Sequence, residues 1–320
     1  MITADDARIR RLLPWPALID AIARTLREGC VVAPRAHHDV EVPGARAATL
    51  LLMPAWAPGR LIGVKVVTVF PDNAARGVPT LDAAYLVFDG NDGRMLACLP
   101  ASELTARRTA AASALAARHL ARAGASRLLV VGTGRVAREL ARAHCSVRPI
   151  GRIRVWGRDA ARAHAFAAEL VADGTCADAA PVHDLRAATG DADVITCATM
   201  STEPLVLGPW LAPGVHLDLV GAFKPAMREA DVDAIRRASV FVDTRHGALH
   251  EAGEIVAAID AGAIGPEHLR ADLAELAAGA HPGRTTEDEI TVFKSVGMAS
   301  EDLAAASLVL EALGAPAAAG

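Results

Sequence analysis

The spacing of apolar residues changes along the chain and predicts a first, mixed region up to about residue 125. A helix predicted over residues 15–28 is followed by short apolar runs that are separated by turn sequences such as Pro58-Gly59. The predicted strands cover residues 48–53, 61–70, 83–88 and 94–99. Because short turns join antiparallel neighbours, these runs predict a sheet of hairpins in a separate α+β domain.

A second pattern begins after a long helix predicted over residues 102–123. Predicted strands and helices alternate there, with strands at Leu128, Ile153, Val194, His216 and Val240 and helices around Ala160, Leu185 and Val232. This alternation predicts a doubly wound parallel α/β sheet with right-handed crossovers. The last predicted helix, over residues 300–313, has no strand of its own, so we expect it to return to the first domain. The expected domains are residues 1–124 together with 294–320, and residues 125–293.

The segment 127–137, RLLVVGTGRVA, joins a strand, a glycine turn and a helix start. Gly132 permits the tight turn, Gly134 lets the backbone approach a phosphate, and Ala137 allows close packing of helix on sheet. A G-x-G-x-x-A pattern alone is weak, and an ordinary strand-to-helix turn is the alternative. The helix that follows and the strand predicted at residues 153–156 favour a Rossmann-type dinucleotide site. Its expected contacts are Gly132, Thr133, Gly134, Arg135 and Val136.

The end of the second strand bears on the choice of nucleotide. An NAD site places a carboxylate there for the ribose, whereas an NADP site offers an arginine to the 2′-phosphate. Here the tip is Gly157, followed by Arg158 and Asp159. NADP is therefore favoured and NAD left open, since Asp159 could either contact the ribose or cap the helix predicted over residues 160–170. The cap is the preferred interpretation.

Composition and charge narrow the partners. The chain has 320 residues, 52% of them hydrophobic, and a net charge of −4 without a basic cluster, which argues against nucleic acid. Its five cysteines are far apart with no C-x-x-C pair, so neither zinc nor a disulfide framework is indicated. His246 and His250 lack the H-E-x-x-H order, and no metal is expected. No export signal or membrane-length apolar run occurs. We expect a cytoplasmic protein with a small-molecule partner.

Four cationic side chains are candidates for a chemical role. Lys65 lies in an otherwise apolar strand, as either an edge-strand gatekeeper or a desolvated proton donor. Arg107 and Arg108 lie in a helix of small residues and have two interpretations. Either one is exposed to solvent and the other lies between two packed helices, or both bind the carboxylate of a substrate or the phosphate of a cofactor. Arg35 is a loop cation open to the same two interpretations. Thr199 and Met200 follow the strand predicted at Val194, at the edge where such sheets bind ligands.

Taken together, the spaced motifs resemble the ornithine cyclodeaminase/mu-crystallin family over about residues 34–310. The motifs are GVKVVTVFP (63–71), GVPT (77–80), LTARRTAA (104–111), the glycine turn and VFKSVGM (292–298). The resemblance implies a homodimer built through the split first domain, with substrate in a cleft below the nicotinamide. It implies that Arg35, Lys65 and Arg108 bind the substrate carboxylate. The cofactor contacts that it implies are Thr80, Arg108, Thr199, Val220 and Ser295.

Two positions depart from the cyclodeaminase pattern of that family. Phe223 stands in place of an aspartate, and Leu51 in place of a glutamate. Cyclodeamination needs a positioned carboxylate for its proton transfers, whereas reduction of a preformed cyclic imine needs an anchor, a proton source and a hydride. The chain therefore resembles the ketimine or Δ1-pyrroline-2-carboxylate reductase branch, an NAD(P)H oxidoreductase of cyclic α-imino acids in proline metabolism, with Lys65 or a water that it holds as proton donor.

Other activities stay open at this point. A cyclodeaminase proper could use another acid such as Asp82, and an opine or alanine dehydrogenase is also conceivable. A mu-crystallin-like protein that binds NADPH and a small ligand without turnover is the alternative from a different class. The size of the substrate ring does not follow from the sequence.

Overall fold

The chain folds into two compact units in a computed structural model that describes residues 2–314. Unit 1 comprises residues up to Arg108 and from Met298 onward, and unit 2 comprises Thr109–Gly297. The expected boundaries after residues 124 and 293 therefore differ from those observed. The first division falls inside helix α3 (Ala101–Leu120), and the second falls after strand β15 (Thr291–Lys294). Ala117 near the end of α3 packs into a core of unit 2, which explains why that part of the helix belongs there.

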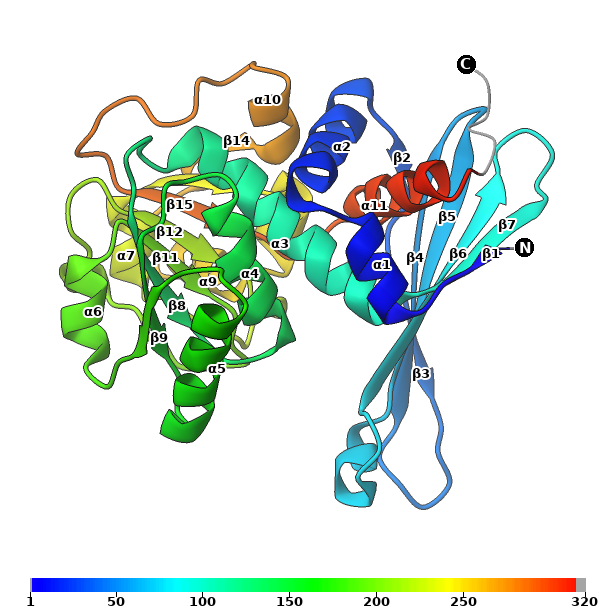
Figure 1. Cartoon of the computed structure of the whole chain (residues 1–320), viewed down its shortest axis with the longest axis horizontal. Coiled ribbons are helices and arrows are strands. Elements are labelled where there is room, and N and C mark those ends of the chain that lie inside the picture. Colours follow the sequence, from blue (N-terminus) through cyan, green and yellow to red (C-terminus); the bar gives the residue numbers. More distant parts are fainter. Residues whose placement is uncertain (1, 315–320) are drawn as a thin grey trace. The chain divides into compact units, whose positions relative to one another are not determined.

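Unit 1 contains the sheet of hairpins that the sequence predicts (Figure 1). Its strand order is β1-β7-β6-β5-β4-β2, with β3 also paired to β4. All neighbours are antiparallel except β1 and β7. The strands are β1 (Ile2–Thr3), β2 (Val31–Val32), β3 (Ala36–Val40), β4 (Ala48–Ala57), β5 (Leu61–Val69), β6 (Leu81–Asp89) and β7 (Met95–Pro100).

The helices of unit 1 cover the face of this sheet that carries Met53 and Lys65. They are α1 (Asp6–Leu12), α2 (Trp15–Glu28), the first part of α3, and α11 (Ala299–Ala312), with a 3₁₀ segment η1 (Pro71–Arg76). The prediction that the last helix returns to the first domain is confirmed, because α11 packs on α2, β4 and β5. Met53 and Leu303 meet in its small apolar core.

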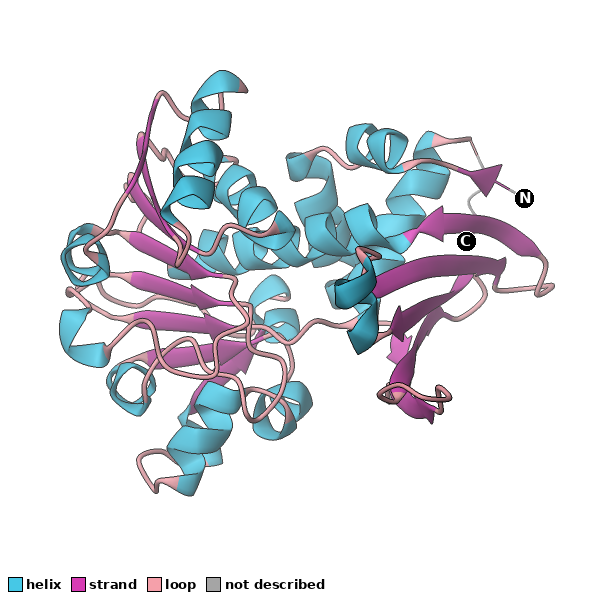
Figure 2. Ribbon diagram, turned by 90° about the horizontal axis from the view of Figure 1, so that it is seen from below, coloured by secondary structure: helices cyan, strands magenta, loops and turns pink. Residues whose placement is uncertain are grey.

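Unit 2 is a parallel sheet with helices on both faces (Figure 2), so the predicted doubly wound fold is confirmed. Its order is β10-β9-β8-β11-β12-β15-β13-β14. The strands besides β15 are β8 (Arg127–Val131), β9 (Arg152–Trp156), β10 (Asp178–Pro181), β11 (Val194–Cys197), β12 (His216–Leu219), β13 (Ser239–Val242) and β14 (Leu269–Asp272). The sequence analysis did not predict β10, β14 or β15, and β15 is a central strand despite coming last in the chain.

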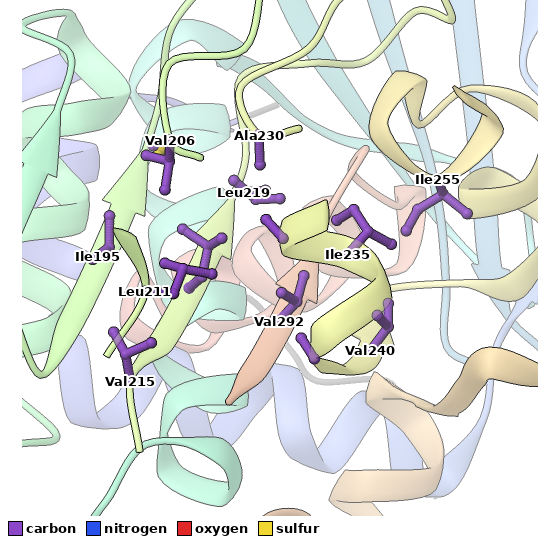
Figure 3. Packing of buried hydrophobic residues seen from close by; sticks show 14 of the residues in the cluster. Ile195, Val206, Leu211, Val215, Leu219, Ala230, Ile235, Val240, Ile255 and Val292 are labelled. Carbon is purple, nitrogen blue, oxygen red and sulfur yellow. The ribbon is translucent and has the colours of Figure 1, made fainter. Parts of the chain in front are cut away.

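The helices of unit 2 complete two apolar layers. They are α4 (Arg135–Cys145), α5 (Ala160–Ala172), α6 (Leu185–Asp191), α7 (Val232–Arg237), α8 (Arg245–His250), α9 (Gly253–Asp260) and α10 (Leu273–Ala277), with η2 (Gly208–Trp210) and η3 (Pro266–His268). Ile195, Leu219 and Val292 share one layer (Figure 3), while Ile153 and Phe166 pack in the other. Because both faces are covered, β11, β12 and β15 are buried along their whole length.

No helix among residues 2–314 is long and apolar enough to cross a membrane. Likewise, the described residues contain no group of three or more His, Cys, Asp or Glu side chains placed to hold a metal ion. His246 and His250 stack on each other in α8, with ring centroids 4.5 Å apart.

Candidate dinucleotide pocket and buried cation cluster

The glycine turn after β8 has the geometry that the sequence predicts. Gly132 has a φ of 126°, and a Cβ there would lie 2.5 Å from the carbonyl oxygen of Ala198, so only glycine fits. Gly134 is the N-cap of α4 and supplies no side-chain acceptor, and a Cβ at this position would meet nothing within 4 Å. Gly134 therefore leaves open space beside the positive end of the α4 dipole. This arrangement fits a pyrophosphate group.

A cavity of about 530 Å³ opens beside this turn. Eight of the expected cofactor residues line it: Gly132, Thr133, Gly134, Gly157, Arg158, Asp159, Thr199 and Met200. Residues lining it that the sequence analysis did not single out as cofactor contacts are Trp156, Arg162, Ala198, Ser201 and Leu205. The cavity runs from the tip of β9 past the glycine turn to the loop after β11, the course that an extended dinucleotide follows on such sheets.

At the tip of β9, the cap interpretation of Asp159 is confirmed. Its carboxylate accepts hydrogen bonds from the backbone N–H groups of Ala161 and Arg162, at 3.0 and 3.2 Å. Gly157 keeps the tip close to the glycine turn, because a Cβ there would lie 2.7 Å from Cγ2 of Thr133. Arg158 and Arg162 both line the pocket, four residues apart at the start of α5. The sequence signal for Arg162 was its position one helical turn beyond Arg158.

The other expected cofactor residues do not line the cavity. Val220 and Ser295 follow β12 and β15 at the carboxyl edge of the sheet, where their backbone N–H groups donate to Cys197 at 3.0 Å and to Leu219 at 3.1 Å. Arg135 and Val136 occupy the first turn of α4. Thr80 and Arg108 belong to unit 1, where Thr80 is exposed just before β6.

In unit 1, Lys65 is the centre of a buried ionic cluster. Its side chain is 4% exposed, and its Nζ lies 2.7 Å from Oδ2 of Asp302. Arg108 is also buried and donates from Nε to Oδ1 of Asp302 at 2.9 Å and from Nη1 to Glu301. The gatekeeper interpretation of Lys65 is wrong, because β5 lies between β4 and β6 and its lysine points into the core under α11.

Arg107 has a structural role. It is buried, donates from Nη2 to the carbonyl oxygen of Leu13 at 2.7 Å and lies 4.0 Å above the ring of Trp15. It thereby joins α3 to the connection between α1 and α2. The interpretation that one of the two arginines is solvated is wrong, since both are buried.

The sequence analysis missed Asp302 and Glu301, the two acids of the cluster. Both lie in the first turn of α11, a helix whose residues 299–306 are all buried. An adjacent acidic pair in a helix of alanines and leucines was the available signal, because buried carboxylates require cationic partners. Two of the three cations that we expected to bind the substrate, Lys65 and Arg108, are therefore already paired with acids of the chain.

Burial and neighbouring charges set the ionisation of this cluster. Burial is the main cause that lowers the pKa of Lys65 to about 8, and Asp302 opposes this shift while Arg108 adds to it. Burial also acts to lower the pKa of Arg108, but the carboxylates of Asp302 and Glu301 outweigh it and the pKa lies above its usual value. Lys65 is thus protonated at neutral pH yet able to release its proton slightly above it.

Tyr85 and Arg35 extend the row of side chains around Lys65. Tyr85 pairs with Lys65 across β5 and β6, and its hydroxyl lies over Gly63, where a Cβ would meet it at 2.0 Å. Within the described residues, this buried hydroxyl has no hydrogen-bond partner. Arg35 directly precedes β3, whose first residue pairs with Leu52, next to the Met53 that pairs with Lys65. The structure therefore places Arg35 two strands from Lys65.

The positions that depart from the cyclodeaminase pattern belong to different units. Leu51 is in β4 and pairs with Val67, whereas Phe223 follows β12 in unit 2 and is 38% exposed, with Nζ of Lys224 5.8 Å from its ring. Asp82, the substitute acid considered above, is exposed in β6 and accepts the backbone N–H of Ala83.

The parallel sheet, the glycine turn, the uncapped helix start and the adjoining cavity define a nicotinamide-dinucleotide-binding α/β protein. The chain belongs to the ornithine cyclodeaminase/mu-crystallin family, whose model matches residues 12–315. It is 43% identical to a Δ1-pyrroline-2-carboxylate reductase of Paracoccus denitrificans over 93% of this chain and 92% of that protein.

Solved structures agree with this assignment. The Δ1-pyrroline-2-carboxylate reductase of Thermococcus litoralis, in complex with NADH and L-proline, superposes with a TM-score of 0.90 and 32% identity, covering 97% of each chain. An archaeal alanine dehydrogenase dimer with bound NAD gives a TM-score of 0.87 and 30% identity, covering 97% of this chain and 94% of that one. A nicotinamide cofactor and an oxidoreductase function follow for this chain.

Proposed function

We propose that this protein reduces a cyclic α-imino acid of the Δ1-pyrroline-2-carboxylate or ketimine type, with NADPH preferred over NADH. The observation that carries the proposal is the buried ammonium of Lys65, held 2.7 Å from Asp302 and with a pKa of about 8. A group that is protonated at neutral pH and close to its pKa is suited to general acid catalysis. The relatives named as pyrroline-carboxylate reductases support the same substrate class.

In this proposal the side chains of the protein bind the imino acid substrate and supply the proton. Reduction adds a hydride to the imine carbon and a proton to the ring nitrogen, and the nicotinamide supplies the hydride when bound. Lys65, or a water that it holds, donates the proton. Arg35, Lys65 and Arg108 hold the substrate carboxylate in this proposal, and the charges of Lys65 and Arg108 are balanced by Asp302 and Glu301.

The preference for NADPH rests on the pocket wall at the tip of β9. Arg158 and Arg162 place two guanidinium groups there, and the single nearby carboxylate, Asp159, is engaged as a helix cap. A 2′-phosphate would gain two charged partners at this point, whereas the ribose hydroxyls of NADH would lack the usual carboxylate acceptor.

A purified sample tests the reaction directly. We expect oxidation of NADPH with pyrroline-2-carboxylate or its six-membered homologue, and no ammonia from L-ornithine. Release of ammonia from ornithine without net change in nicotinamide absorbance would instead identify a cyclodeaminase. That second activity is favoured by one observation, since Asp302 and Glu301 provide carboxylates that the positions of Phe223 and Leu51 lack.

A protein that only binds its ligand is distinguished by Lys65→Met. We expect this variant to lose turnover while it retains NADPH binding. If neither the natural chain nor the variant turns over any imine and both bind ligand equally well, the reductase assignment is wrong.

We also propose a homodimer formed through the sheet of unit 1. Alternate side chains of β4 and β5 on the face opposite Lys65 are apolar and only half-buried, among them Leu52, Trp56, Val64 and Val66. Apolar sheet faces of this kind are typical of interfaces between subunits. The structural relative described as an alanine dehydrogenase dimer supports a dimeric state.

A further inference from the structure

The loop after β11, residues 198–201, lines the cofactor cavity through Ala198, Thr199, Met200 and Ser201. Its position depends on a buried carboxylate from elsewhere in unit 2. Oε1 of Glu229 accepts the backbone N–H of Thr199 at 2.6 Å and its hydroxyl at 2.8 Å. Oε2 of the same side chain accepts the backbone N–H of Gly221, in the loop after β12, at 2.7 Å.

The two loops joined by Glu229 are in close contact. A Cβ at Gly221 would lie 2.1 Å from the carbonyl oxygen of Thr199 and 2.4 Å from its backbone nitrogen. The backbone next to Glu229 adds further ties, because Arg228 donates its N–H to Ser201 at 2.9 Å and the Glu229 carbonyl accepts from Leu205 and Val206 at 2.9 Å. Removing the carboxylate would leave the amides of Thr199 and Gly221 without their acceptor.

The backbone of Glu229 is held in turn by a buried ion pair, Glu254 with Lys294. Oε1 of Glu254, in α9, accepts the backbone N–H of Glu229 at 2.8 Å. Its other oxygen lies 3.2 Å from Nζ of Lys294, at the end of β15, and all three side chains are buried. The arrangement places one cation beside two carboxylates.

We propose that Glu229 is the positioning residue of the nicotinamide half of the cofactor site. Its ionised carboxylate fixes the loop of residues 198–201 against residue 221. Glu254 holds the backbone of Glu229, and the positive charge of Lys294 favours the ionised form of its carboxylate. The adenosine half of the cavity, at the tip of β9, is built from other residues and does not depend on Glu229. Loss of this carboxylate should therefore weaken binding of the whole dinucleotide while leaving its adenosine diphosphate part unaffected.

The environment of Glu229 also makes the arrangement sensitive to pH. The facing groups are Lys294 from β15, Glu254 from α9, the Cys197 thiol from β11, and the donors of Thr199 and Gly221. Burial is the main cause that raises the pKa of Glu229 to about 7, with Glu254 adding to the shift while Lys294 and the Thr199 bonds oppose it. The carboxylate is thus ionised above about pH 7 and loses its charge as the pH falls through that value.

The test is the dissociation constant of NADH, measured by fluorescence titration, beside that of ADP at pH 8. We expect Glu229→Gln to weaken NADH binding about fivefold at pH 8, the difference between a charged and a neutral acceptor, and to leave ADP binding unchanged. In the natural protein the dissociation constant of NADH should rise about fivefold from pH 8 to pH 6. At pH 6 it should equal the dissociation constant of the Glu229→Gln variant. The variant should show no such change.

Glu203→Gln is the matched control, because Glu203 is an exposed acid just beyond the same loop whose side chain is not involved in these bonds. It should behave as the natural protein does. Equal weakening of NADH and ADP by Glu229→Gln, or unchanged NADH binding, would overturn the proposal. Should Glu229→Gln fail to fold, a flat pH dependence of NADH binding in the natural chain would overturn it equally. None of these measurements depends on the imine substrate, so they stand apart from the proposed reaction.

Discussion

At the scale of single residues, the carboxylate of Asp302 decides how two cations of unit 1 behave. It lies 2.7 Å from Nζ of Lys65 and accepts from Nε of Arg108 at 2.9 Å. Both hydrogen bonds are shielded from water, and charge-assisted hydrogen bonds are strongest in such a buried environment. Burial lowers the pKa of Lys65 to about 8 while Asp302 acts to raise it, so Lys65 keeps its proton at neutral pH.

Asp302→Asn should shift the pH dependence of the reaction. In the proposed reaction Lys65 must be protonated, so kcat/KM of the natural enzyme should fall as the pH rises through about 8. Without the negative charge of Asp302 the pKa of Lys65 decreases. The alkaline limb of the pH profile of kcat/KM should therefore shift to lower pH by at least ~1 pH unit. The measurement is kcat/KM for the imine from pH 6 to 9.

Glu301→Gln is the control for this change, because Glu301 pairs with Arg108 and contributes less than Asp302 to the pKa of Lys65. The alkaline limb of the Glu301→Gln variant should stay near that of the natural enzyme. An alkaline limb that is the same in the natural enzyme and in Asp302→Asn would exclude Lys65 as the titrating group.

At the scale of elements, the proposed preference for NADPH depends on one strand, one turn and one helix start. β9 ends at Trp156, Gly157 passes close to the glycine turn, and α5 begins after the capping carboxylate of Asp159. The charged residues among those lining the pocket are Arg158, Arg162 and Asp159, so this wall carries a net positive charge even though Oδ2 of Asp159 lies 3.7 Å from Nε of Arg162.

Arg158→Asp should invert the preference for the cofactor. Loss of a guanidinium–phosphate contact, replaced by repulsion, should raise the KM for NADPH by about 10- to 100-fold, while the KM for NADH changes less than about threefold. Steady-state rates with both cofactors provide the measurement. Arg186→Asp, an exposed charge reversal in α6 outside the pocket, should alter neither value. An unchanged NADPH preference in Arg158→Asp would place the 2′-phosphate elsewhere.

At the scale of the whole molecule, the chain contributes its two ends to unit 1 and its middle to unit 2. Helix α11 brings Asp302 and Glu301 to a sheet formed by residues more than two hundred positions earlier. Strand β15, just before it, enters the centre of the parallel sheet between β12 and β13. The C-terminal segment therefore completes both units.

Val66→Glu should disrupt the proposed dimer. Val66 lies in β5 on the half-buried apolar face, paired with Leu52 and Ala84, and a charge there would be desolvated in an interface. We expect the dimer to be weakened by about 100-fold, or ~2.7 kcal/mol. Light scattering during size-exclusion chromatography at several concentrations measures this. Val171→Glu, at a valine of α5 that is 45% exposed, should leave the mass unchanged. The proposed interface would be refuted if the natural protein and Val66→Glu were both monomeric, or if both formed equally stable dimers.

The sequence by itself determined the local features of this protein. Helix α2, the hairpin strands, the glycine turn and the Asp159 cap follow from patterns within a few residues, because turn geometry, periodicity and capping are short-range properties. Lys65 was recognised for the same reason, as a charge inside an apolar run.

Tertiary structure decided which groups meet across long distances in sequence. Strand β15 is four residues long and its pattern does not separate it from a loop, so its central place depended on packing between β12 and β13. The pairing of Lys65 and Arg108 with Asp302 and Glu301, and the bonds from Glu229 to two loops, join segments that no local pattern relates. Buried charges must find partners somewhere in the fold, and only the folded chain determines which partners those are.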